Sequence, residues 1–178
     1  MASDADRPTR RLLVGLMADA SVQFQIGEYR RLWTWPSGAG VSPAPNLHLT
    51  LHFLGDVDET KERALREAIR IMNITPMKLR LETAEVWPGG IAVLRPNENV
   101  ALSQLRRNVE DAMRVARLVP DTRPFEPHVT LAYNAMGAVP PTEPVSIGWN
   151  ASTVSLVWMR SRAAGYSLVV ERWPPLPR

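Results

Sequence analysis

The chain has 178 residues, of which 45% are hydrophobic and 22% are charged, and these ordinary values exclude a wholly disordered or collagen-like protein. Cysteine is absent, which excludes a disulfide framework, a thiolate nucleophile and a Cys-based zinc site. The net charge is +3, and no basic tail or charge block marks a nucleic-acid binder. The longest apolar runs are too short to span a bilayer, so we expect a cytoplasmic protein.

Hydrophobic periodicity predicts strands and helices that mix without strict alternation. The expected elements are a disordered leader over 1–9, strand 10–18, helix 20–33, loop 35–45, strand 47–54 ended by Gly55, a helix with an Asp56-x-x-Glu59 start signal, strand 77–87, a Gly89-Gly90 turn, strand 91–95, helix 100–118, loop 120–127, strand 128–134, a Pro-rich loop 139–144, and closing strands 152–160 and 166–173. This order indicates a single α+β domain over 10–178 with a mostly antiparallel sheet.

The same tetrapeptide occurs twice in the chain. His48-Leu49-Thr50-Leu51 and His128-Val129-Thr130-Leu131 both read H-x-T-L, and each lies inside an expected strand. A single copy would carry no meaning, but two copies among only three histidines indicate an internal repeat.

Strand alternation sorts the residues of each copy onto two faces. In the first, Leu47, Leu49, Leu51 and Phe53 are expected to face inward, while His48, Thr50 and His52 face outward. An imidazole and a hydroxyl two residues apart then lie about 6.7 Å apart on the same side. In the second copy, Val129 and Leu131 are expected inward, with His128 and Thr130 outward.

Two such strands side by side would line a phosphate-sized groove with an acid, a base and two neutral donors. One neutral imidazole takes a proton from the attacking oxygen, and one charged imidazole gives a proton to the leaving oxygen. Thr50 and Thr130 donate to the non-bridging oxygens, where charge accumulates. This chemistry requires neither a metal nor another cofactor.

Other interpretations of the histidines and tryptophans are weaker. His52 lacks the Thr-Leu that follows the other two histidines, so we expect it only to flank the groove. A strand would separate His48 from His52 by about 13 Å, which is too far for a shared zinc ion. Trp33 and Trp35 adjoin the loop that enters the first motif, where stacking on a base is an alternative to a place in the core.

The duplicated motif resembles the two-histidine phosphoesterase superfamily, and within it the LigT-like branch of RNA 2′,3′-cyclic phosphodiesterases and 2′-5′ RNA ligases. The resemblance extends across Asn46–Gly55 and Arg123–Ala132, and to the closing strand pair through Leu156, Ser161 and Tyr166. It covers residues 10–175.

The resemblance implies a bilobal, pseudo-two-fold fold with helices outside a central groove. It implies cleavage of a 2′,3′-cyclic phosphate to a 2′-phosphate by His48, Thr50, His128 and Thr130, with His128 favoured as base and His48 as acid for hydrolysis. Some members also join or cut 2′-5′ linkages reversibly. The expected partners are RNA ends or small cyclic nucleotides, bound by a monomer.

One position departs from the branch, because Tyr133 stands where Arg is common. Alternation from His128 places Tyr133 on the face of Val129 and Leu131, at the strand end beside the groove. The loss of the arginine charge leaves the core chemistry untouched but puts contacts with the RNA backbone in question. Two other functions stay open. One is a phosphodiesterase for another small phosphate such as ADP-ribose cyclic phosphate, and the other is a non-catalytic RNA or nucleotide binder.

Overall fold

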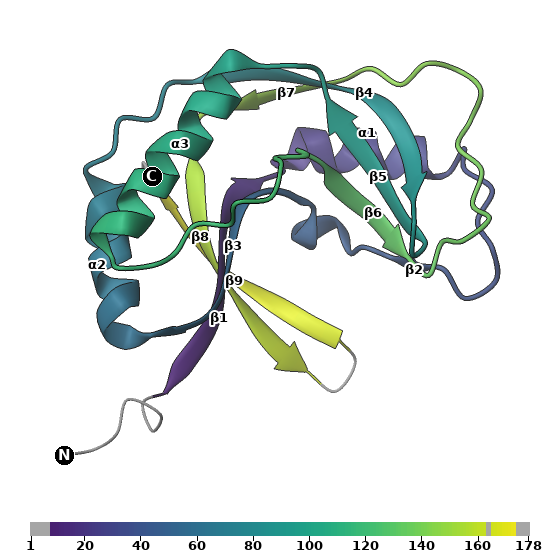
Figure 1. The fold of residues 1–178 in the computed structure, drawn as a ribbon. Coiled ribbons are helices and arrows are strands. Elements are labelled where there is room, and N and C mark those ends of the chain that lie inside the picture. The colour runs from purple at the N-terminus through teal and green to yellow at the C-terminus, as the bar shows by residue number, and fades with distance from the viewer. Residues whose placement is uncertain (1–7, 163–164, 174–178) are drawn as a thin grey trace.

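A computed structural model describes residues 8–162 and 165–173 (Figure 1). The strands are β1 (Thr9–Met17), β2 (Gly40–Val41), β3 (His48–Asp58), β4 (Met77–Trp87), β5 (Ile91–Pro96), β6 (Val129–Tyr133), β7 (Ile147–Ala151), β8 (Val154–Arg162) and β9 (Gly165–Trp173). The helices are α1 (Ala20–Arg30), α2 (Glu59–Arg70) and α3 (Val100–Val115), with a 3-10 turn η2 over Ala44–Asn46. Most of the disordered leader expected over 1–9 lies outside the described residues, and Thr9 already belongs to β1.

These strands form one curled sheet in the order β7-β4-β5-β6-β3-β1-β8-β9, and β2 pairs with β6. Neighbouring strands run antiparallel, and Leu49 opposite Val129 is the residue pair that joins β3 to β6. Four strands of this order lie on each side of the junction, and β2 adds a fifth on the β6 side. The expected α+β class with antiparallel pairing is confirmed, and the halves have the expected pseudo-two-fold arrangement.

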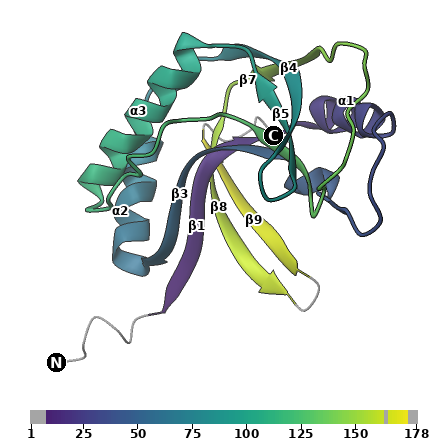
Figure 2. The ribbon, with the colours of Figure 1, turned by 45° about the vertical axis from the view of Figure 1, so that its right-hand side comes forward.

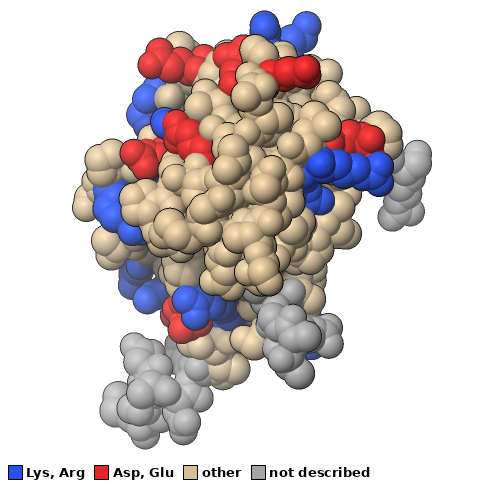
Figure 3. Space-filling model, turned by 90° about the vertical axis from the view of Figure 1, so that its right-hand side faces the viewer, with Lys and Arg blue, Asp and Glu red and all other residues tan. Residues whose placement is uncertain are grey.

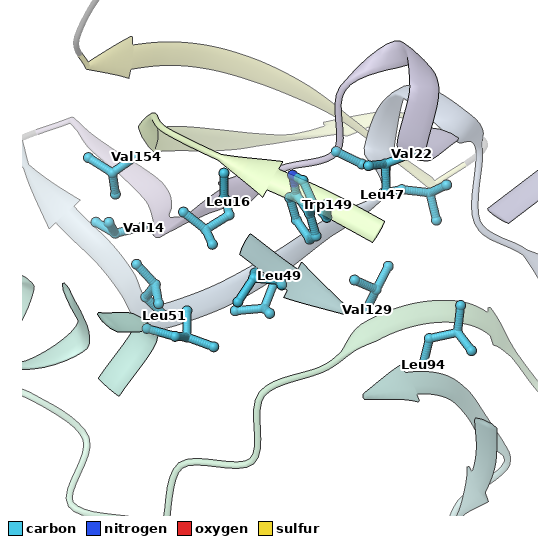
Figure 4. Close-up of a cluster of buried hydrophobic side chains, with 14 of the residues drawn as sticks. Val14, Leu16, Val22, Leu47, Leu49, Leu51, Leu94, Val129, Trp149 and Val154 are labelled. Carbon is cyan, nitrogen blue, oxygen red and sulfur yellow. The ribbon is translucent and has the colours of Figure 1, made fainter. Parts of the chain in front are cut away.

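The helices cover the sheet from its outer side. Figures 1 and 2 show α2 and α3 together at one end of the molecule and α1 at the other. Leu65 and Ile69 of α2 are fully buried, and α3 packs against β3. Figure 4 shows the core beneath them, where Leu49 and Val129 lie among side chains from several strands. Each such buried side chain stabilises the fold by roughly 1.5–3 kcal/mol.

The start of α2 differs from the expectation. Asp58, and not Asp56, caps the helix, because its carboxylate accepts a hydrogen bond from the Lys61 backbone N–H at 3.0 Å. Gly55 does not end β3. It lies at an irregularity in the pairing with β1, with a φ of 67° that favours glycine, and the strand continues to Asp58.

One strand was not predicted, and one of the two alternatives left open for Trp33 is excluded. β7 was not foreseen, yet it extends the sheet beside the first half of β4. Trp33 is buried in the core and stacks on Trp35 with ring centroids 4.8 Å apart, so it has no face free for a base. In the described part of the chain, no helix is long and apolar enough to cross a membrane.

Candidate active site

The two H-x-T-L motifs lie side by side at the centre of the sheet. Because Leu49 pairs with Val129 in antiparallel register, His48 lies across from Thr130 and Thr50 lies across from His128. Leu49 and Val129 are fully buried in the core, whereas the four polar residues are half-buried. The fold therefore brings all four residues singled out from the sequence together on one face.

Both histidines are oriented in the same way. The Nδ1 of His48 lies 2.6 Å from the carbonyl oxygen of Asn46, and the Nδ1 of His128 lies 2.7 Å from that of Glu126. A carbonyl oxygen only accepts, so each Nδ1 carries the proton and donates it. This leaves Nε2 of each ring as the atom that takes up or releases a proton, with the tautomer fixed by the backbone two residues earlier.

His48 is electrostatically coupled to His128. Burial lowers the pKa of His48 below the ordinary value for histidine, the hydrogen bond to Asn46 partly offsets this, and the charge of His128 lowers the pKa further. His48 is therefore mainly neutral at pH 7 in the free protein. A bound phosphate anion would favour its charged form again.

A cavity of about 450 Å³ opens beside Thr50 and His128. Three aromatic residues line it: Phe53, Trp87 and Phe125. The Trp87 ring meets the His128 ring edge-on, with centroids 4.4 Å apart. This cavity is large enough for a nucleoside and offers rings on which a base can stack.

Charged side chains also line this cavity. The Arg106 guanidinium lies 4.9 Å from the centre of the Phe125 ring, and its Nη1 lies 2.9 Å from a Glu110 carboxylate oxygen. Arg123 donates hydrogen bonds to Asp121 and lowers the pKa of that carboxyl to about 2. Among residues 8–162 and 165–173, no three His, Asp or Glu side chains gather closely enough to hold a metal ion.

The strand alternation expected after each motif is interrupted. The pairing of β3 with β1 passes from His52 to Thr50 in one step, which leaves Leu51 as a bulge. The pairing of β6 with β5 likewise passes from Ala132 to Thr130 and leaves Leu131 as a bulge. An extra residue in one strand reverses the faces of the residues beyond it.

The bulges correct the expected positions of His52, Phe53 and Tyr133. His52 is 2% exposed and its Nε2 lies 3.2 Å from the Arg106 carbonyl oxygen of α3, so it is buried where an open outward position was expected. It still lines the cavity beside Thr50 and His128, as expected of a residue that flanks the groove. Phe53 and Tyr133, both expected on the inward face, are each 43% exposed. They follow the two bulges at equivalent positions, on the side of the sheet that carries the histidines.

Sequence reasoning assigned no role to Trp87, Arg106 or Phe125. Phe125 lay within the segment compared with the family, three residues before His128, so position alone would have placed it near the site. Trp87 and Arg106 come from β4 and α3, which approach the site only through the folded sheet. No local pattern marks such residues.

Comparisons with known proteins identify relatives of the chain. The model of the 2′-5′ RNA ligase superfamily matches residues 19–160. The chain is 29% identical over 174 residues to the RNA 2′,3′-cyclic phosphodiesterase of Escherichia coli strain K12, covering 95% of each protein. It is 31% identical over 91 residues to the enzyme of the same name from Bacillus subtilis strain 168, covering 48% of this chain and 50% of that protein.

Solved structures of Escherichia coli LigT share the fold. The apo form has a TM-score of 0.83 at 26% identity, and the complex with 3′-AMP has a TM-score of 0.79 at 25% identity. Both alignments cover 93% of this chain and 97% of the other.

Proposed function

The chain belongs to the 2′-5′ RNA ligase superfamily, and from this membership we propose that it hydrolyses RNA 2′,3′-cyclic phosphates to 2′-phosphates. The observation that carries the proposal is the matched pair of H-x-T motifs, in which backbone carbonyls hold both imidazoles with Nε2 free to exchange a proton. A site that only binds phosphate needs no two proton-exchanging groups in mirrored positions.

In the proposed reaction, water attacks phosphorus in line with the bond to O3′. One imidazole takes the proton from the attacking water, and the other gives a proton to O3′ as the P–O3′ bond breaks. Thr50 and Thr130 donate hydrogen bonds to the non-bridging oxygens, where charge grows in the transition state. The product is a 2′-phosphate with a free 3′-hydroxyl.

We assign the base role in hydrolysis to His128 and the acid role to His48. The lowered pKa of His48 in the free protein makes it a good proton donor once it is charged, but leaves it largely neutral at pH 7. The negatively charged substrate favours the protonated form of His48, because a phosphate anion beside the imidazole raises the pKa of His48. The substrate therefore helps to charge its own acid catalyst.

The substrates proposed are RNA ends and small cyclic nucleotides. The test is incubation with each 2′,3′-cyclic nucleoside monophosphate and with a short RNA ending in a cyclic phosphate, in excess EDTA. We expect turnover of both. Loss of activity with EDTA that zinc restores would contradict the metal-independent mechanism. The expectations of a monomer acting in the cytoplasm stay predictions.

A further inference from the structure

A second cavity lies next to the cavity that adjoins the two motifs. It has a volume of about 480 Å³ and lies between the end of β5 and the start of α3. Phe125 lines both cavities, and Pro127 of the same segment lines the second. The proposed reaction needs no group from this second cavity, which we call the β5–α3 cavity. A molecule that leaves the first cavity over Phe125 enters the β5–α3 cavity.

Arg95 connects the β5–α3 cavity to the face of the sheet that carries the histidines. Leu94 of β5 pairs with Val129 of β6 in antiparallel register, so Arg95 lies across from His128. Side chains of residues directly across from each other lie on the same face of a sheet. Because Arg95 also lines the β5–α3 cavity, this cavity opens beside the catalytic face.

The side-chain contacts of Arg95 agree with this placement. Nη1 of Arg95 lies 3.6 Å from one carboxylate oxygen of Glu85, and the other oxygen accepts a hydrogen bond from Trp87 Nε1 at 2.8 Å. Trp87 in turn meets the ring of His128. A separation of 3.6 Å is longer than a hydrogen bond, so the ion pair with Glu85 leaves the N–H groups of Arg95 available to an anion in the cavity.

The charge of the β5–α3 cavity suits a phosphate. Its lining includes two cations, Arg95 and Arg107, and one carboxylate, the exposed Glu98. Nη2 of Arg107 donates to the uncharged amide oxygen of Gln104 at 2.7 Å, and within residues 8–162 and 165–173 Arg107 forms no ion pair. A guanidinium presents a planar fork of N–H groups that matches a phosphate, and it stays charged.

The segments around the two motifs offer no such charge. Residues 32–55 and 127–142 contain no Lys, Arg, Asp or Glu. Figure 3 shows the face formed by the loops after α1 and β6, on which charged side chains are confined mainly to the edges. A polyanion that extends from the phosphate site is therefore favoured in the direction of the β5–α3 cavity.

We infer that the β5–α3 cavity is a subsite for the phosphate on the 5′ side of the terminal nucleotide of an RNA, and that Arg95 and Arg107 bind this phosphate. The inference rests on the proposed function and adds a preference for oligonucleotides over mononucleotides. The terminal nucleoside occupies the first cavity with its cyclic phosphate at the histidines, so O5′ and the next phosphate extend from the other side of its ribose.

This arrangement is typical of sites for single-stranded nucleic acids, which combine aromatic rings for the bases with a cationic path for the backbone. The rings lie in the first cavity, and the cations Arg95 and Arg107 lie in the second. Contacts with a phosphate carry no information about the base, so the subsite accepts RNA ends of any sequence.

The test compares three substrates that share the 2′,3′-cyclic phosphate: 2′,3′-cyclic AMP, its 5′-phosphorylated form, and the dinucleotide ApA with a terminal cyclic phosphate. For the wild-type protein, kcat/KM should be higher for the two substrates that carry the extra phosphate. The logarithm of kcat/KM should also fall more steeply with the logarithm of the salt concentration, by a slope of about 0.7 for one additional phosphate contact.

Arg95→Gln combined with Arg107→Gln should lower the ratio of kcat/KM for the dinucleotide to kcat/KM for cyclic AMP by about tenfold, near the lower end of the range for charge-assisted hydrogen bonds. The added salt dependence should disappear as well. Arg63→Gln is the matched control, because Arg63 of α2 is ion-paired with Glu59 and lines neither cavity. If the double variant does not fold, Arg107→Gln alone, at an exposed position of α3, tests the subsite.

The outcomes separate the inference from the function on which it rests. An unchanged ratio in the folded variants, an equal loss on all three substrates, or a gain for the dinucleotide that the 5′-phosphate alone does not give would overturn the inference and leave the proposed function standing. Failure of the wild-type protein on all three substrates would overturn the proposed function, and the inference with it.

Discussion

A methyl group added at Gly15 tests whether the spacing of β1 and β3 sets the geometry of the first motif. A Cβ atom at Gly15 would lie 2.5 Å from the carbonyl oxygen of Leu49 and 3.3 Å from the Cα of Thr50. These are backbone atoms that no rotamer change can move aside, so reaching an ordinary contact of 3.4 Å requires β3 to shift by about 0.9 Å. The shift falls between His48 and Thr50.

Gly15→Ala should therefore lower the free energy of unfolding by about 1–3 kcal/mol, the usual cost of overpacking. It should also reduce kcat on a 2′,3′-cyclic nucleotide by up to about a hundredfold, because a misplacement of about 1 Å has effects of that order. Urea unfolding and steady-state kinetics measure the two effects separately.

Gly27→Ala provides the matched control. No atom lies within 4 Å of a Cβ at this position, which is in the interior of α1. The substitution should leave kcat unchanged and stabilise the protein by about 0.5–1 kcal/mol. If Gly15→Ala matched the wild-type protein in both kcat and unfolding free energy, the contact with β3 would not constrain the site.

Three other predictions concern the polar residues. Thr50→Val and Thr130→Val should each raise the barrier to catalysis by about 2–4 kcal/mol, seen as lost kcat, as when one oxyanion donor is removed; a loss confined to KM would contradict this. Burial lowers the pKa of His52 from 6.5, so the unfolded chain binds more protons below that pH and stability falls on acidification. His52→Gln should show a smaller drop in urea midpoint between pH 7.5 and 5.5 than the wild-type protein, and an equal drop would exclude His52 as the cause. The pH–rate profile should be bell-shaped, losing its acidic limb in His128→Ala and its basic limb in His48→Ala. A flat profile between about pH 5 and 9, with chemistry rate-limiting, would reject acid–base catalysis.

The sequence was sufficient to predict the centre of the site because its signal is local. Period-two alternation holds across His48–Leu51 and His128–Leu131, and the repetition of the motif identifies the functional face. Beyond these residues, the face of the sheet on which a side chain lies depends on the pairing with the neighbouring strand. Whether Leu51 and Leu131 become bulges is decided by pairing with β1 and β5, which no pattern within β3 or β6 records. Phe53 and Tyr133 were placed on the wrong face for this reason, and His52 was expected to be open where it is buried.

Other errors came from contacts between distant segments. β7 has an alternating pattern, with Ile147 and Trp149 buried and Gly148 exposed, but it is short and its glycine weakens the strand signal. Its pairing with β4, some seventy residues earlier, stabilises it. The start of α2 was misjudged because Gly55 was taken as the end of a strand that continues to Asp58.

The position of the phosphate in the product tests the central claim most directly. Hydrolysis of 2′,3′-cyclic AMP, followed by ³¹P NMR in excess EDTA, should give 2′-AMP as the single product. His48→Ala and His128→Ala, each folded, should form it at least about a hundredfold more slowly. Formation of 3′-AMP, or near-normal turnover by either histidine variant, would contradict the two-histidine account.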